Sequence, residues 1–157
     1  MSKKSVGYYE ISAGIIKIVC DENYVLSVDF SDEKRENDKD SKVLDNALKQ
    51  MDEYFKGKRK KFDLPLYFNG TDFQKSVWKA LTEIPYGETV SYQDIARKIN
   101  NEKAVRAVGG ANNKNKIMIM VPCHRVIGKN GKLVGFAGGL DKKEFLLAHE
   151  KEINNKG

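Results

Sequence analysis

The sequence predicts an α/β (α+β) fold in two domains: a small antiparallel-sheet N-terminal domain over residues 1–68 and a mainly helical C-terminal domain over residues 69–157. Three observations predict this division. Runs rich in β-branched and aromatic side chains, separated by short turns, fill residues 6–30. Apolar side chains recur at helical spacing after residue 71. Between residues 91 and 111, two short helices joined by a tight turn form a helix-turn-helix, winged-helix-like motif.

The N-terminal domain is predicted to be a meander of three strands with one covering helix. The strands are expected at 6–12, 14–20 and 24–30. A helix is expected over 43–55, with Ser41 as its N-cap. Cys20 ends the second strand and is predicted to be a buried structural thiol, because free cysteine packs as a small hydrophobe. Residues 62–68, which include Pro65, are expected to form an edge strand or linker that leads to the domain boundary.

The C-terminal domain is predicted to begin with three helices. The first starts at Thr71 or Asp72 and ends before Gly87. The second opens with the Ser-x-x-acid capping box that begins at Ser91 and runs to about residue 100, and the third is expected over 102–111. Two short helices joined by a tight turn, the second of them basic, are typical of proteins that bind duplex DNA.

The second helix of this motif has unusually small side chains. They are Ala104, Ala107, Gly109, Gly110 and Ala111. Each glycine inside a helix costs about 1 kcal/mol relative to alanine, so a compensating interaction is expected. Small residues allow close approach of the helix backbone to DNA or to the neighbouring domain. Arg106 is the one long side chain at the centre of this stretch, and from the sequence it is equally a DNA contact or half of a surface ion pair.

The excess of positive over negative charge lies entirely in the second part of the chain. The net charge is +6, yet residues 1–68 hold 13 basic and 13 acidic side chains, against 15 and 9 in residues 69–157. Residues 97–132 contain nine Lys and Arg and only one acid, Glu102. Such asymmetry is typical of a surface that binds a polyanion, although a solvated basic face without a partner is the alternative.

Composition limits the class of protein further. With 157 residues, the chain can bury about two-thirds of its unfolded surface. No apolar run approaches the length of a membrane span, so no membrane partner is expected. The N-terminus lacks the apolar segment of a signal peptide, which predicts a cytoplasmic protein with two free thiols. The two Cys and two His lack the spacing of a zinc site, so no metal is expected.

A cysteine and a histidine stand side by side at Cys123 and His124, after a predicted buried strand at 117–121. A cysteine becomes a nucleophile as the thiolate, and a nearby imidazole can take its proton. Adjacent side chains often point apart, so the pair alone favours a catalytic role and a structural role for Cys123 equally. Beyond it, the sequence predicts a hairpin turn at 129–132, a glycine-rich loop at 135–139 that could close over a flat ligand, and a helix at 141–151.

Several motifs together resemble the O6-alkylguanine-DNA alkyltransferase family. They are Arg-Ala-Val-Gly-Gly-Ala at 106–111, Asn115, Val-Pro-Cys-His-Arg-Val-Ile-Gly at 121–128, Gly-Phe-Ala-Gly-Gly-Leu at 135–140 and Lys-Glu-Phe-Leu-Leu-Ala-His-Glu at 143–150. The resemblance covers about residues 72–150, and its Pro-Cys-His-Arg-Val segment is highly specific. Two other classes remain as alternatives: a helix-turn-helix regulator with a structural or redox-sensing cysteine, and a cysteine hydrolase that turns over.

The resemblance implies direct repair of duplex DNA that contains O6-alkylguanine. The cysteine accepts the alkyl group once and is not regenerated, no cofactor is needed, and O4 of thymine is a second candidate substrate atom. Carried over by position, the catalytic set is Cys123, His124, Glu150, Asn115 and Tyr92. In this set, His124 and Glu150 would activate Cys123 through a water, Asn115 would hold the site together, and Tyr92 would donate toward N3 of the base.

The resemblance also implies how the DNA and the base are held by a protein that acts as a monomer. Contacts to DNA are expected from Arg106, Ala104, Ala107, Gly109, Gly110, Ala111 and Arg125, with Arg106 filling the space left by a flipped nucleotide. The base pocket is expected to comprise Phe136, Ala137, Val126 and Gly138, with the carbonyls of Cys123 and Val126 at the base edge.

The sequence departs from the family pattern at two positions. Phe136 stands where the family often has tyrosine, so the ring can stack on a base but cannot donate a proton. Lys116 follows Asn115 where the family commonly has proline. Neither change affects the expected nucleophile.

Overall fold

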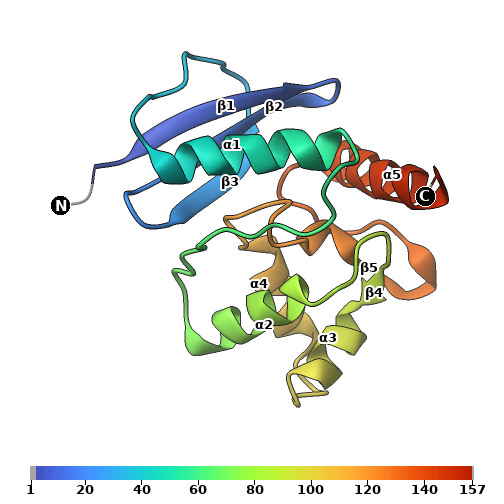
Figure 1. The fold of residues 1–157 in the computed structure, drawn as a ribbon. Coiled ribbons are helices and arrows are strands. Elements are labelled where there is room, and N and C mark those ends of the chain that lie inside the picture. The colour runs from blue at the N-terminus through green and yellow to red at the C-terminus, as the bar shows by residue number, and fades with distance from the viewer. Residues whose placement is uncertain (1–2, 157) are drawn as a thin grey trace. The chain divides into compact units, whose positions relative to one another are not determined.

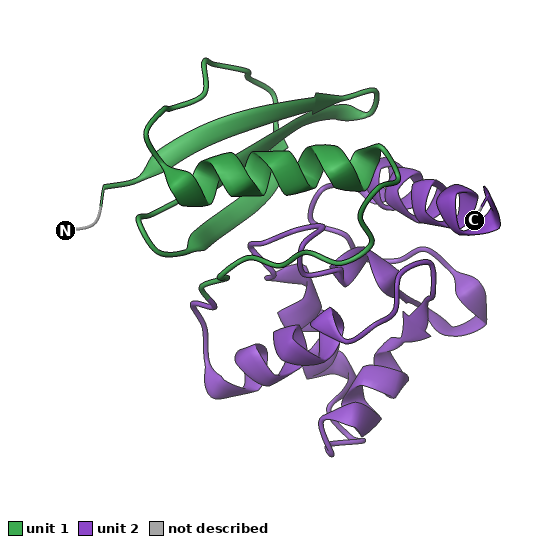
Figure 2. Ribbon diagram, viewed as in Figure 1, with its two compact units in different colours: residues 1–67 green, residues 68–157 purple. Residues whose placement is uncertain are grey.

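The computed structural model describes residues 3–156, which fall into two compact units, 3–67 and 68–156 (Figure 2). The first unit is a three-stranded antiparallel sheet with one helix, and the second is mainly helical. The predicted fold class is confirmed. Sequence reasoning divided the chain at 68/69, and the structure divides it at 67/68.

In the first unit, β1 (Ser5–Ile11), β2 (Gly14–Cys20) and β3 (Val25–Ser31) pair in sequence order. Helix α1 (Lys42–Phe55) packs along the sheet, as Figure 1 shows. The predicted cap is confirmed, because Oγ of Ser41 accepts a hydrogen bond from the Leu44 amide at 3.1 Å. A β-carbon at Gly7 would approach Leu44 to 3.0 Å, so a glycine lets the helix lie close to the strand. Cys20 is fully buried, as predicted.

The second unit is built around four helices (Figure 1). They are α2 (Asp72–Thr82), α3 (Tyr92–Lys98), α4 (Val105–Asn113) and α5 (Leu140–Lys156). Thr71 caps α2 and Ser91 caps α3, each through a reciprocal capping box. The indole N–H of Trp78 donates to the Ala111 carbonyl at 2.8 Å and ties α2 to α4. Helices α3 and α4 are the predicted helix-turn-helix pair.

The connection between α4 and α5 holds short elements. A 3-10 turn, η1 (Cys123–Arg125), precedes strand β5 (Val126–Ile127), which pairs in parallel with β4 (Val90–Ser91). A second 3-10 turn, η2 (Lys129–Gly131), follows β5. This pairing brings the N-terminus of α3 beside the segment that carries Cys123.

The predicted strand at 117–121 is wrong. This segment is a buried turn, in which the Val121 amide donates to the Ile117 carbonyl at 3.0 Å and Ile119 has φ +73°. Its apolar run reflects burial, because all five residues are at most 6% exposed. The predicted turn at 129–132 has positive φ at Asn130 and Gly131, which is the form expected of an Asn-Gly hairpin turn. The residues after it, 133 and 134, are not a strand.

Candidate active site

Cys123 is the first residue of η1 and is 3% exposed. The turn before it is held by Asn115, whose side-chain amide donates to the Val121 carbonyl at 2.9 Å and whose Oδ1 accepts from the Ile117 amide at 3.0 Å. Burial raises the pKa of the Cys123 thiol to about 11, while Asn115 and Lys143 act in the opposite direction. The thiol is therefore protonated at neutral pH, and a base must remove its proton before it can act as a nucleophile.

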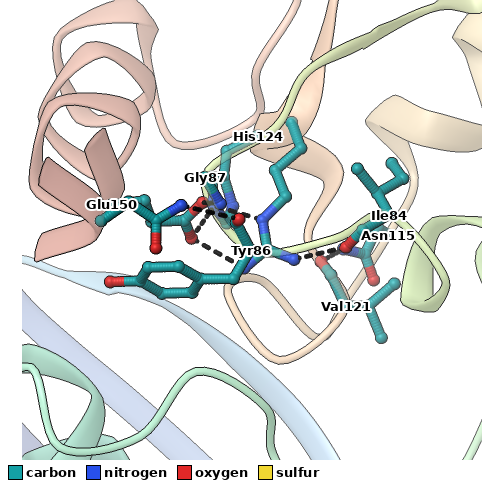
Figure 3. A network of polar contacts seen from close by, with 9 residues as sticks. Ile84, Tyr86, Gly87, Asn115, Val121, His124 and Glu150 are labelled. Carbon is teal, nitrogen blue, oxygen red and sulfur yellow. Dashed lines mark hydrogen bonds and ion pairs between the residues drawn. The ribbon is translucent and has the colours of Figure 1, made fainter. Parts of the chain in front are cut away.

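His124 and Arg125, which follow Cys123 in the chain, form a buried polar network with Glu150. Figure 3 labels His124 and Glu150 in this network. His124 Nε2 is 2.7 Å from one Glu150 oxygen. Arg125 donates to both oxygens of the same carboxylate, at 2.8 and 2.9 Å, and also to the Ile84 carbonyl at 2.7 Å. The backbone amide of Gly87 reaches Glu150 at 3.3 Å. The Glu150 carboxylate on α5 is thus bonded to η1 and to Gly87, which lies in the connection between α2 and β4.

The charges in this network fix the tautomer of His124. Burial favours the neutral carboxyl group, but the hydrogen bonds and charges of His124 and Arg125 hold the pKa of Glu150 well below its usual range. An ionised carboxylate only accepts hydrogen bonds, so Nε2 of His124 must be the protonated nitrogen. Burial lowers the pKa of His124, which keeps the ring neutral. Its Nδ1 then carries a lone pair, and that atom is buried without a hydrogen-bond partner among residues 3–156.

Lys143, on α5, is a buried cation that sequence reasoning missed. Its Nζ donates to the carbonyls of Val126 at 2.6 Å, Val134 at 2.8 Å and Gly135 at 3.4 Å. Its three N–H bonds are thereby satisfied, and they hold the glycine-rich loop against β5. Burial lowers the pKa of Lys143, and the nearby Cys123 opposes that shift. The signal in the sequence was the position of Lys143 on the buried stripe of α5 that also contains Leu146 and Glu150.

Tyr92 is the first residue of α3. Its hydroxyl donates to the Val134 carbonyl at 3.1 Å. Burial raises the pKa of Tyr92, Cys123 adds to the rise, and the Asn112 side chain opposes it. The phenol is therefore protonated at neutral pH and can act as a proton donor. Asn112, whose side chain opposes the rise, is a residue that sequence reasoning did not select.

The residues expected in the base pocket lie along β5 and the following loop. Val126 is fully buried, Phe136 and Gly138 are half-buried, and Ala137 is exposed. The loop closes on itself through a hydrogen bond from the Gly139 amide to the Phe136 carbonyl at 3.0 Å.

The residues expected to contact DNA divide into two groups. On α4 and its N-cap, Arg106, Ala107 and Gly110 are exposed, and Ala104 and Gly109 are half-buried. A β-carbon at Gly110 would meet nothing within 4 Å, so no packing inside the protein requires a glycine there.

Two of the residues expected to contact DNA, Ala111 and Arg125, are buried in the structure. Ala111 is 3% exposed and faces α2, where its carbonyl receives the Trp78 indole. Arg125 is 5% exposed, and its guanidinium is used by Glu150 and the Ile84 carbonyl. The family resemblance implied a DNA contact for Arg125, but a buried carboxylate 25 residues away holds its side chain inside the protein.

Helices that could span a membrane and side-chain groups that could hold a metal ion are absent from the described chain, residues 3–156. No helix there combines the length and apolar character needed to cross a membrane. Within the same range, no three or more His, Cys, Asp or Glu side chains are grouped as a metal site would need.

Fold and site together define a protein with a β-rich N-terminal domain and a helix-turn-helix C-terminal domain that carries a buried cysteine next to a neutral histidine base. Residues 72–152 match the family described as 6-O-methylguanine DNA methyltransferase, DNA binding domain. Residues 5–71 match its ribonuclease-like domain. The chain therefore belongs to the family of methylated-DNA–protein-cysteine methyltransferases.

Individual relatives are similar along most of the chain. A methylated-DNA–protein-cysteine methyltransferase of Methanosarcina acetivorans is 51% identical over 148 residues, which cover 90% of this chain and 95% of the relative. The constitutive enzyme of that name from Bacillus subtilis is 54% identical over 114 residues, 72% of this chain and 69% of the relative.

Solved structures agree with this assignment. The crystal structure of Mycobacterium tuberculosis O6-methylguanine methyltransferase has a TM-score of 0.85 at 39% identity and covers 96% of this chain and 94% of that one. A second structure from the same organism, in complex with DNA, has a TM-score of 0.85 at 40% identity, with coverage of 94% and 93%.

Proposed function

We propose that this protein repairs DNA by transferring a methyl or other alkyl group from O6 of guanine in duplex DNA to its own Cys123. One observation carries the assignment of Cys123: the buried thiol adjoins a histidine whose Nδ1 lone pair is fixed by the ionised Glu150 on the opposite ring nitrogen. Cys20, the other cysteine, ends a strand in the first unit and is also fully buried.

The proposed transfer is a single displacement. The S–H bond of Cys123 breaks, and its proton passes through one water to Nδ1 of His124, where Glu150 stabilises the imidazolium that forms. The thiolate then attacks the alkyl carbon, so the S–C bond forms while the bond from that carbon to O6 breaks. Negative charge develops on the leaving guanine, and the Tyr92 hydroxyl donates a proton to N3. The product is a thioether, which no group in this mechanism reconverts to a thiol, so each molecule acts once.

Tyr92 must change its hydrogen-bond partner in order to act. Its hydroxyl is donated to the Val134 carbonyl, which also accepts from Lys143. Because Lys143 continues to donate to that carbonyl, the tyrosine can turn to the base without leaving the carbonyl unpaired. Lys143 therefore acts as a positioning residue for the loop that holds Phe136 over the base.

Helices α3 and α4 form the proposed DNA face. The alkyl carbon is inaccessible while guanine is stacked, so the nucleotide must be flipped out, which costs a few kcal/mol of unstacking. Arg106 is exposed on α4 and is proposed to fill the space left in the duplex. The exposed Ala107 and Gly110 beside it let the helix backbone approach the DNA closely.

Intact mass measurement tests the proposal. The protein is incubated with a duplex that contains one O6-methylguanine, and we expect one methyl addition, mapped to Cys123 and saturating at one equivalent. Cys123→Ser should abolish the addition and largely spare DNA binding. Cys20→Ser is the matched control and should still be methylated. An unchanged mass in the wild type would refute the proposal, and release of product beyond one equivalent would favour a hydrolase.

The same experiment tests the finer assignments. A duplex with O4-methylthymine measures whether thymine is also a substrate. We further propose that the protein acts as a monomer in the cytoplasm, because one copy of the chain supplies all of the site residues and both cysteines are free thiols. Size measurement of the DNA complex by light scattering would contradict the monomer if it gave two copies of the chain per short duplex.

A further inference from the structure

The segment between β3 and α1, residues 32–40, lies against the outer edge of β1 (Figure 1). Every residue in this segment except Asn37 is charged, and all of them are exposed. The segment has no apolar side chains to bury, so hydrophobic packing cannot hold it against a strand. Its contacts to β1 are made by polar atoms instead.

These contacts take up the outward-facing backbone groups of β1. The strand pairs only with β2, and in an antiparallel pair every second residue points its N–H and C=O away from the partner strand. The Val6 amide donates to Oδ2 of Asp38 at 2.7 Å, and the Asp38 amide donates back to the Val6 carbonyl at 2.9 Å. The Tyr8 amide donates to Oδ1 of Asn37 at 2.6 Å. Residues 37 and 38 thus occupy the place that a fourth strand would fill.

The contact continues along the strand to Glu10, the next residue of the same alternation. Its carboxylate pairs with Nζ of Lys34 at 3.1 Å. Because both side chains are more than half exposed, this ion pair adds little to stability. It does extend the contact, so that residues 6, 8 and 10 of β1 each meet a side chain of the segment.

The other edge of the sheet is also covered at its start. The Val25 amide of β3 donates to the Pro65 carbonyl at 2.7 Å, and the Tyr67 amide donates to the Val25 carbonyl at 3.0 Å. An open sheet edge is a template on which another chain can pair, and folded proteins usually block it. Both edges of this sheet are therefore blocked by the chain itself.

An uncovered β1 would be well suited to pair with a second copy of itself. Its sequence, Ser-Val-Gly-Tyr-Tyr-Glu-Ile, has β-branched and aromatic residues, no proline and one charge, which favours strand pairing. Antiparallel pairing of two copies about Tyr8 would place Val6 of each copy opposite Glu10 of the other. No like charges then face each other, so this arrangement is self-complementary.

We propose that the side chains of Asn37 and Asp38 cover a latent association surface, the outer edge of β1, and that the partner this surface fits is β1 of a second copy. With the cover in place, the edge amides are taken and the chain does not associate through this strand. With the cover removed, two copies join edge to edge into one continuous sheet. The inference concerns the first unit alone and does not depend on transfer of an alkyl group to Cys123.

Sedimentation velocity over a range of protein concentrations tests the cover. The double variant Asn37→Ala with Asp38→Ala removes both acceptors and leaves β1 unchanged. Its mass should rise with concentration toward twice that of one chain, while the wild type shows no such rise. Glu36→Ala is the matched control, because it removes one negative charge from the same exposed segment. It should sediment as the wild type does. Equal masses of the wild type and the double variant at every concentration would overturn the inference.

A charge at Val6 identifies the surface through which the double variant associates. Val6 is half-buried. Val6→Glu, added to the double variant, places a carboxylate opposite Glu10 of the second copy at both ends of the pairing and should restore the mass of one chain. Val6→Lys places opposite charges there and should keep the dimer. Aggregation of unfolded chains would not distinguish the two charges in this way, so equal masses of the Val6→Glu and Val6→Lys variants would show that the inference is wrong.

Discussion

Replacement of Glu150 by glutamine is the most severe test of the buried network. The carboxylate is 1% exposed and receives hydrogen bonds from Arg125, His124 and the Gly87 amide. In Glu150→Gln, one oxygen becomes an NH2 group that meets donors, and Arg125 is left buried without its counter-charge. Removing one partner of a buried ion pair destabilises a protein by about 3–5 kcal/mol.

That loss of stability can be measured directly. For a chain of this length, 1 kcal/mol corresponds to a fall of about 2–4 °C in melting temperature, so Glu150→Gln should melt at least about 6 °C below the wild type. Glu152→Gln is a matched control on the same helix, since Glu152 pairs with Lys156 at 3.1 Å with 66% of its side chain exposed. Surface pairs of this kind contribute less than about 1 kcal/mol.

The pH dependence gives an independent check. The pKa of Glu150 is held below its usual range in the folded protein, so its contribution to stability is present above the unfolded value of about 4.3 and is lost as the pH falls. The difference between wild type and Glu150→Gln should therefore shrink below about pH 4.3 in chemical denaturation. If Glu150→Gln lost no more stability than Glu152→Gln at pH 7, our account of the network would be refuted.

Three other outcomes are expected. Burial lowers the pKa of His124. Below about pH 6.5 the unfolded chain therefore binds a proton that the folded chain excludes. The free energy of unfolding should then fall by up to about 1.4 kcal/mol per pH unit as the pH decreases. Denaturation curves of His124→Gln should lack this slope, whereas the slope should persist in His149→Gln; persistence in both would contradict the assignment. Arg106→Ala should slow transfer from duplex DNA at least about tenfold, because flipping costs a few kcal/mol, but should scarcely alter transfer from single strands. The control is Arg97→Ala, which removes an exposed arginine of α3. An unchanged rate of transfer from duplex DNA in Arg106→Ala would exclude the flipping role. DNA affinity should fall steeply with salt, and Lys103→Ala should reduce the logarithmic slope by about 0.9 if Lys103 binds one phosphate.

The sequence predicts the chemistry of the site well where the signal is local. The caps at Ser41, Thr71 and Ser91 were readable because a capping side chain bonds to an amide only two or three residues away. Cys123 and His124 could be predicted as site residues because they are adjacent in a specific motif. Their geometry could not be predicted, since the tautomer of His124 depends on a carboxylate 26 residues further along the chain.

Prediction failed where distant contacts override local preference. The apolar run at 117–121 satisfies a buried strand pattern, yet the Asn115 side chain takes the backbone groups that a neighbouring strand would have bonded. Arg125 and Lys143 are residue types that normally face water, and both are buried because the acceptors for their charge come from other elements. No local pattern reveals such partners, although the buried stripe of α5 gave a partial indication for Lys143.

The open space at Gly110 has a consequence for how far this protein can be stabilised. An alanine there would meet no atom of the protein and would favour helix α4 by about 1 kcal/mol. The same methyl group would stand on the face proposed to lie against DNA and would hold the helix backbone away from it. Thermal resistance and close contact with DNA therefore set opposite demands on this one position, and a screen that selected for melting temperature alone would select against the DNA-binding surface.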